Sequence, residues 1–158
     1  ISPSMDIQVS SNFERALFDA YDREGPAIVQ LMEELKSGGF EVSQGAMQVL
    51  QSHYASGRAS EAETSAAITS TLEQSGELLC PHTAVGVKVA EEHLGANPMV
   101  TLATAHPAKF PDAVQQATGA RPPLPSRFAG LYERPERVTE VANDLTALQS
   151  LIRERRRA

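Results

Sequence analysis

The sequence contains no tryptophan, and aromatic residues of all kinds make up only 5% of its 158 positions. A buried core therefore has to be built mainly from aliphatic side chains such as leucine, valine and alanine. The single cysteine, Cys80, excludes an intrachain disulfide and a two-cysteine metal motif. It also suits a reducing compartment, so we expect a cytoplasmic protein.

Targeting and binding signals are missing as well. No stretch is long and apolar enough for a membrane span, and no charged segment followed by an apolar run predicts a signal peptide. The net charge of −6 disfavours nonspecific binding to nucleic acid or anionic membranes, so we expect neither partner. The one basic run, Arg153–Arg157, is interpreted as a helix end whose cations complement the helix dipole.

Capping signals and apolar periodicity predict a mostly helical chain. The expected helices start at a capping box Ser11–Glu14, at Pro26 (ending at Gly38-Gly39), at Ser43 (ending near Ser56), at a second capping box Ser60–Glu63 (ending at Gly76), at Pro81 (ending at Gly95), at Pro111 (ending at Gly119), and at Asn143 or Asp144.

Short strands are predicted at Met5–Val9, Met99–Ala103 and Val138–Val141. The second of these is a continuous apolar run after Asn97-Pro98, a pattern typical of a buried strand. Strands so few and so far apart make a poor sheet alone, so we interpret them as members of a larger mixed sheet. The predicted class is α/β, and since the sequence opens on Ile1 we expect a piece of a longer chain.

None of the four histidines, His53, His82, His93 and His106, has a metal-binding spacing. His53 and His93 are expected to be structural or solvated. His82, in the first turn of a helix, is expected to be neutral if buried. His106 follows a predicted strand end, where ligand sites of open α/β sheets lie. It is a site candidate on position, with a structural role as the alternative.

The lysines are Lys36, Lys88 and Lys109. A lysine that forms a Schiff base needs a partly desolvated pocket. Lys36 is expected to be exposed at a helix end, and the amine of Lys88 is expected to reach solvent from within a helix. Only Lys109 lies near the loop that follows a predicted strand, and no phosphate-binding glycine motif or nucleophile elbow is present.

Four stretches together resemble threonine synthase, in the longer form found in bacteria and fungi. They are SPSMDIQVSSNFER at Ser2–Arg15, PHTAVG at Pro81–Gly86, TAHPAKF at Thr104–Phe110 and VANDLTALQSLI at Val141–Ile152. The resemblance runs in order along essentially the whole chain. It implies that residues 1–158 are the C-terminal part of the catalytic region of a tryptophan-synthase-β-like, fold type II pyridoxal-phosphate enzyme. That lyase converts O-phospho-L-homoserine and water to L-threonine and phosphate.

The resemblance also implies that the Schiff-base lysine and the glycine-rich phosphate loop precede this sequence. No catalytic residue is then expected here, and the isolated chain is expected to be inactive and not to bind pyridoxal 5'-phosphate. Thr104 would hydrogen-bond the pyridine nitrogen of that cofactor, the alternative being that it merely ends a strand. Asn12 and Arg15 are candidates for the substrate phosphate, although an ordinary capped helix start explains them equally well. His106 and Lys109 are further pocket candidates.

Cys80 stands where the resembled family usually has aspartate before PHTAVG. Cysteine is a poorer N-cap, and we expect the change to cost about 1 kcal/mol of stability. A second hypothesis remains open, namely a free-standing helical ligand-binding or interaction module without catalysis. If the chain is instead a fragment, its uncovered apolar faces predict self-association.

Overall fold

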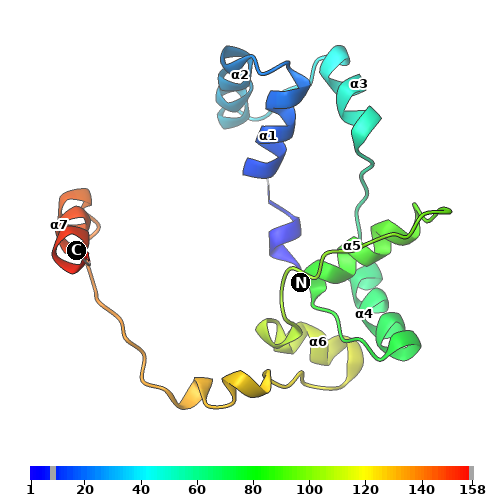
Figure 1. The fold of residues 1–158 in the computed structure, drawn as a ribbon, viewed down its shortest axis with the longest axis vertical. Coiled ribbons are helices and arrows are strands. Elements are labelled where there is room, and N and C mark those ends of the chain that lie inside the picture. The colour runs from blue at the N-terminus through cyan, green and yellow to red at the C-terminus, as the bar shows by residue number, and fades with distance from the viewer. Residues whose placement is uncertain (8–9, 157–158) are drawn as a thin grey trace. The chain divides into compact units, whose positions relative to one another are not determined.

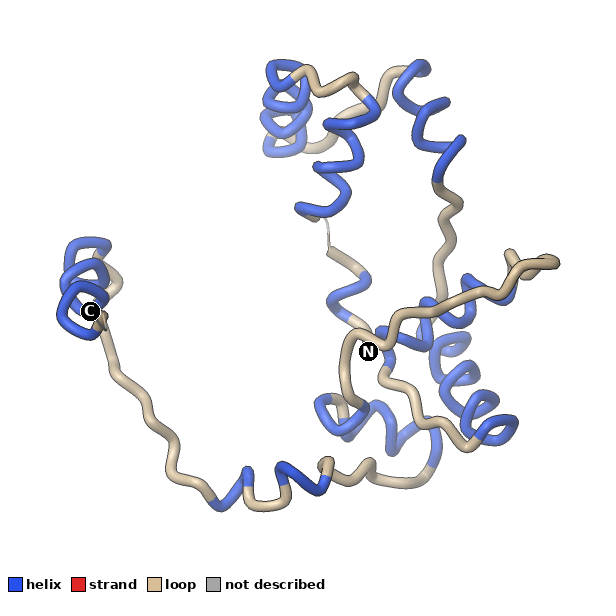
Figure 2. Tube along the Cα trace, in the orientation of Figure 1, coloured by secondary structure: helices blue, strands red, loops and turns tan. Residues whose placement is uncertain are grey.

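The computed structural model describes residues 1–7 and 10–156, which form α-helices and short 3-10 helices (Figures 1 and 2). The α-helices are α1 (Ser11–Ala20), α2 (Gly25–Lys36), α3 (Gln44–His53), α4 (Glu61–Ser75), α5 (Pro81–Glu91), α6 (Pro111–Thr118) and α7 (Leu145–Arg155). The 3-10 helices are η1 (Pro3–Met5), η2 (Pro107–Lys109), η3 (Ser126–Phe128) and η4 (Leu131–Glu133). The chain divides into two compact units, Ile1–Pro123 and Leu124–Ala158.

Helices α1, α2 and α3 share one small aliphatic core. Its buried members are Leu17, Ile28, Leu31 and Leu50. The Tyr21 ring packs against this cluster, and its hydroxyl accepts a hydrogen bond of 2.9 Å from the Ser43 N–H. That bond joins the end of α1 to the start of α3.

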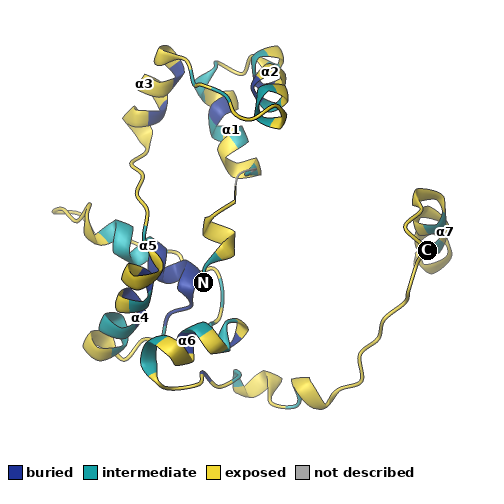
Figure 3. Ribbon diagram, turned by 180° about the vertical axis from the view of Figure 1, so that it is seen from behind, coloured by how far each residue is buried: buried dark blue, intermediate teal, exposed yellow. Residues whose placement is uncertain are grey.

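Helices α4, α5 and α6 form the second core of the first unit. Ile68 on α4 and Ala84 on α5 are fully buried and pack together with Leu79. The Thr69 hydroxyl donates to the Ala117 carbonyl at 2.8 Å, which ties α4 to α6. The first turn of α5 is buried at every position, as Figure 3 shows by its dark blue colour. This turn positions the candidate site.

Most of the predicted helix ends are confirmed. Ser60 and Glu63 form the capping box of α4, and α6 ends at Gly119 in the left-handed conformation with φ 76°. Asp144 caps α7 through a 2.7 Å bond from the Ala147 N–H. The capping box at Ser11–Glu14 is wrong by one residue, because the N-cap of α1 is Ser10.

Helix α5 is also shorter than predicted. It ends at Glu91, and Glu92 is the C-cap, whose N–H donates to the carbonyls of Val89 and Ala90. Residues 94–98 are not helical. Its Cys80 N-cap accepts the Thr83 N–H at 3.4 Å, so the thiol does cap the helix.

The strand predictions are wrong in the described part of the chain, which contains no strand. Met5 lies in η1, while Gln8 and Val9 of the same predicted strand lie outside the described residues. Residues 99–103 form an extended loop in which Val100 is 77% exposed, and residues 138–141 are exposed as well. An extended apolar run needs a neighbouring strand for its backbone groups, and the described residues provide none.

The second unit contains η3, η4 and α7. No residue of α7 is buried, and its apolar positions Leu145 and Ile152 are exposed. Arg153 and Arg155 lie in its last turn, as predicted for a basic helix end, while Arg157 lies outside the described residues. None of the helices in the described ranges is long and apolar enough to cross a membrane.

Candidate functional site

Thr104 and His106 lie together on one wall of a cavity of about 320 Å³. Residues 103–107 line this cavity together with residues 77–80 and Thr83. Thr104 is exposed and is one of the residues that line the cavity. The structure thus brings together two of the predicted site residues, although they do not follow a strand.

His106 has a structural function in addition to lining the cavity. Its Nδ1 accepts a hydrogen bond of 3.1 Å from the Ala108 N–H and thereby caps η2. An accepting Nδ1 leaves Nε2 as the nitrogen that carries the proton in the neutral ring. The ring therefore offers a donor at Nε2, while Nδ1 is used to hold the turn that follows Thr104.

Cys80 and Thr83 are cavity residues that the sequence reasoning missed. Both are buried, and the Cys80 Sγ lies 3.2 Å from the Thr83 Oγ1. They belong to the N-terminal turn of α5, where the helix dipole creates a positive end. The sequence signal for them is the cap position directly before Pro81, which by itself predicts only a helix start.

Lys109 is not among the residues that line this cavity. It is exposed at the end of η2. Burial, and then the positive charge of Lys109, lowers the pKa of His82 below its usual range. Lys109 thus acts on a neighbouring imidazole, and no contact assigns it to the cavity that Thr104 lines.

His82 is buried beneath η1 and next to Phe110. Its Nε2 accepts the Ser4 N–H at 3.1 Å, and its ring lies 4.5 Å from the Phe110 ring, centroid to centroid. The Nδ1 atom has no hydrogen-bond partner among the described residues. The lowered pKa agrees with the sequence expectation of a neutral ring.

Asn12 and Arg15 lie in the first turns of α1 and are hydrogen-bonded to each other, with the Arg15 guanidinium donating to the Asn12 side-chain oxygen. Both are exposed. Arg15 lines a hollow of about 410 Å³ that Glu14 also lines, and this carboxylate opposes a bound anion. The N-terminus of α1 supplies free N–H groups that favour one.

The two sets of predicted site residues belong to different helical groups. Within the described ranges, no hydrogen bond or ion pair links Asn12 or Arg15 to the Thr104 segment. The structure therefore gives two partial sites.

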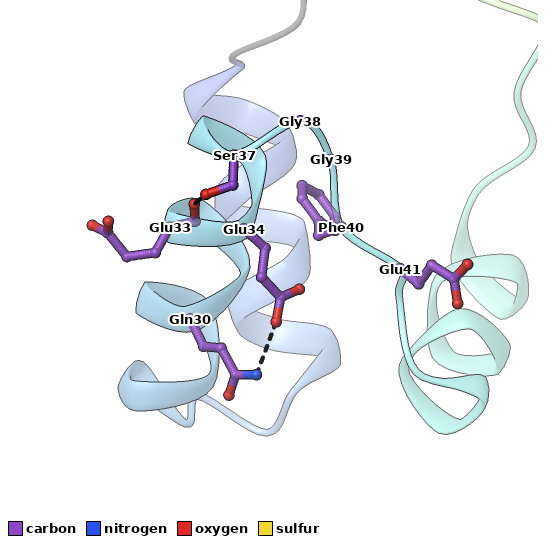
Figure 4. Close-up of a pocket in the computed structure, with 8 residues that line it drawn as sticks. All are labelled: Gln30, Glu33, Glu34, Ser37, Gly38, Gly39, Phe40 and Glu41. Carbon is purple, nitrogen blue, oxygen red and sulfur yellow. Dashed lines mark hydrogen bonds between the residues drawn. The ribbon is translucent and has the colours of Figure 1, made fainter.

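Another hollow, of about 860 Å³, lies between the end of α2 and residues 37–41 (Figure 4). Glu33, Glu34 and Glu41 line it, and Gln30 donates to Glu34 at 2.9 Å. The carboxylates of Glu33 and Glu34 in the last turn of α2, together with that of Glu41 in the following loop, disfavour a phosphate group. None of the predicted site residues lies there.

The remaining lysines are bound to surface carboxylates. Lys36 pairs with Glu33 at 2.6 Å. The Lys88 amine donates to Glu92 and to the Arg58 carbonyl, which confirms that it reaches the surface from α5. The described residues contain no cluster of three or more histidine, cysteine or acidic side chains that could hold a metal ion.

Comparison with known proteins gives one consistent match. A family model described as "Threonine synthase, C-terminal" matches residues 83–152. The threonine synthase of Pseudomonas aeruginosa is 45% identical over 156 residues, which cover 96% of this chain and 33% of that relative.

Two solved structures agree with this match. One is the pyridoxal-phosphate-bound threonine synthase of Brucella melitensis, with a TM-score of 0.85, 50% identity, and coverage of 99% of this chain and 34% of that one. The yeast threonine synthase has a TM-score of 0.76 and 30% identity over 97% of this chain and 35% of that one. The chain thus spans about a third of the length of the relatives it matches.

Proposed function

We propose, because this chain corresponds to the C-terminal third of threonine synthases, that it works as part of an enzyme converting O-phospho-L-homoserine and water to L-threonine and phosphate. In this proposal residues 1–158 are the C-terminal part of a fold type II catalytic region, and the lysine and phosphate loop are supplied by a preceding part. The enzyme acts in the cytoplasm, which the free, buried Cys80 suits.

The observation that carries the proposal is the extent of the match. Nearly the whole chain aligns with threonine synthases. Its sequence is 50% identical to that of one whose solved structure contains bound pyridoxal phosphate. The alternative of a free-standing module has weaker support, because α7 has no buried residue and the extended residues 99–103 have no strand partner in the described chain.

The residues around Thr104 fit one end of pyridoxal phosphate. The cofactor has a ring nitrogen, an aldehyde and a phosphate, and it supplies an electron sink for the substrate carbon skeleton when bound. A threonine hydroxyl can hydrogen-bond the ring nitrogen, and the walls of its cavity carry no lysine or arginine for the phosphate or the aldehyde. The residues that line this cavity therefore fit only the ring-nitrogen end of pyridoxal phosphate. This agrees with a cofactor site that another part of the enzyme completes.

Each proposed residue then has a distinct task. Thr104 orients the ring by a neutral hydrogen bond and, unlike a carboxylate, does not enforce a charged ring nitrogen. His106 holds the turn after Thr104 through its bond to the Ala108 N–H. Asn12 orients Arg15, whose planar guanidinium is suited to bind the substrate phosphate in a bidentate manner.

A direct test is to mix the isolated 158-residue chain with pyridoxal phosphate and O-phospho-L-homoserine. We expect no visible absorption band from a protein-bound cofactor and no formation of threonine. The reason is that the Schiff-base lysine is proposed to lie in the preceding part of the enzyme and not in these 158 residues. A bound-cofactor band or threonine formation by the chain alone would refute this assignment of roles. Stable cellular accumulation of a 17.0 kDa species would instead favour the module.

A further inference from the structure

Helix α5 and the segment that carries Thr104 approach each other unusually closely at one point. A Cβ atom placed on Gly86, in the middle of α5, would lie 3.1 Å from the Thr101 Cγ2 atom. Such a contact is tighter than ordinary van der Waals distances, so Thr101 would have to move by a few tenths of an ångström. The absent side chain of Gly86 thus lets the segment lie directly on the helix.

The same segment also lies beside the N-terminal turn of α5. Residues 103–107 share a cavity with Cys80 and Thr83 at the N-terminal turn of the helix. Between Gly86 and Cys80 the helix axis rises by about 9 Å, at 1.5 Å per residue. The chain from Thr101 to Thr104 can span at most about 10 Å. Because Thr101 and Thr104 are only three positions apart in the sequence, a shift at Thr101 is passed on to Thr104.

We infer that Gly86 is a positioning residue that sets where the Thr104 hydroxyl is presented. The inference rests on the proposed role of Thr104 toward the cofactor ring, but it concerns a contact between two elements of this chain. The helix itself does not need the glycine, because alanine is the better helix former by about 1 kcal/mol in a helix interior. The requirement comes from the neighbouring segment.

The test is Gly86→Ala in the full-length chain to which these residues are proposed to belong. We expect the unfolding midpoint to stay constant or rise, because helix propensity improves and the added methyl meets only the Thr101 side chain. The dissociation constant of pyridoxal phosphate, measured by cofactor fluorescence, should rise about 2- to 10-fold, as for the loss of one neutral hydrogen bond. The absorption maximum of the bound cofactor should shift as well.

Two further variants keep the test specific. Thr101→Ser removes the Cγ2 methyl, so adding it to Gly86→Ala should restore the affinity and the absorption maximum. Gly45→Ala places the same methyl on α3, where nothing lies within 4 Å, and should leave the affinity unchanged. Equal affinity in the wild type and Gly86→Ala, or a loss that Thr101→Ser does not reverse, would overturn the inference.

The proposed function can fail separately. If the wild-type full-length chain binds no pyridoxal phosphate, the enzymatic assignment is wrong. The amide chemical shifts of residues 101–104 would then still report on the contact, because Gly86→Ala should displace Thr101 and the added Thr101→Ser should return the shifts toward their wild-type values. Unchanged shifts of these residues in Gly86→Ala would refute the positioning contact by itself.

Discussion

His82 combines burial, an aromatic neighbour and a backbone hydrogen bond in one residue. It stabilises the contact between η1 and α5 only while its Nε2 is unprotonated and can accept the Ser4 N–H. Burial is the main cause of its lowered pKa, followed by the charge of Lys109. A histidine whose folded-state pKa is depressed contributes stability above its unfolded pKa of about 6.5, and this contribution is lost as the pH falls.

The corresponding prediction compares the wild type with His82→Gln, whose amide oxygen can replace the acceptor but does not titrate. We expect the free energy of unfolding of the wild type to fall relative to the variant as the pH is lowered from 7.5 to 5.5. One proton limits the difference in slope to about 1.4 kcal/mol per pH unit. Urea unfolding at several pH values measures it, and parallel pH profiles would contradict the account.

At the scale of single elements, the caps account for most helix starts. In α4 the Ser60 Oγ accepts the Glu63 N–H at 3.2 Å, and the Glu63 carboxylate accepts the Ser60 N–H at 2.8 Å. Hydrogen bonds from the Ser60 N–H and hydroxyl, and then the charge of Lys88, lower the pKa of Glu63. The side chains of Ser60 and Glu63 thus each accept a hydrogen bond from the other residue's N–H, as a capping box requires.

Ser60→Ala should therefore destabilise the chain by about 1 kcal/mol, because the N-terminal turn of α4 loses its side-chain acceptor. The matched control is Ser52→Ala, an exposed serine that donates only to the Val49 carbonyl and should change stability by less than about 0.5 kcal/mol. Chemical denaturation of the three proteins compares the two effects. Equal stability of Ser60→Ala and the wild type would show that the cap contributes nothing.

The elements also show how far the sequence could predict the structure. Local signals succeed where the cause is local, as for Pro26, Ser43 and Gly119. The strand at Met99–Ala103 fails because strand formation depends on a partner far away in the sequence or outside it. Around the candidate cavity, the resemblance predicts Thr104 and the position after a predicted strand predicts His106, whereas Cys80 and Thr83 join the cavity only through the folding of α5 beside residues 103–107.

The molecule as a whole exposes many apolar side chains. Val100 and Leu102 are 77% and 75% exposed, and Leu145 and Ile152 on α7 are 69% and 58% exposed. Apolar surface of this kind commonly marks an interface. Its presence agrees with a chain that covers only about a third of the relatives it matches.

Isolated in solution, the 158-residue chain should self-associate, and its weight-average sedimentation coefficient should rise with concentration. The double variant Val100→Ser with Leu102→Ser should weaken this association, because it removes apolar area from the extended segment. Val29→Ser on α2, 63% exposed in the wild type, serves as the control. A strictly monomeric wild type at high concentration would contradict the prediction.

The most direct measurement of the central claim is phosphate release from O-phospho-L-homoserine by a chimera. In it, this chain follows the N-terminal two thirds of the Brucella melitensis threonine synthase, which is 50% identical over the shared region. We predict that the chimera binds pyridoxal phosphate and releases one phosphate per threonine formed, while the isolated chain releases none. A chimera that binds the cofactor but forms no threonine, or an isolated chain that forms it, would contradict the account.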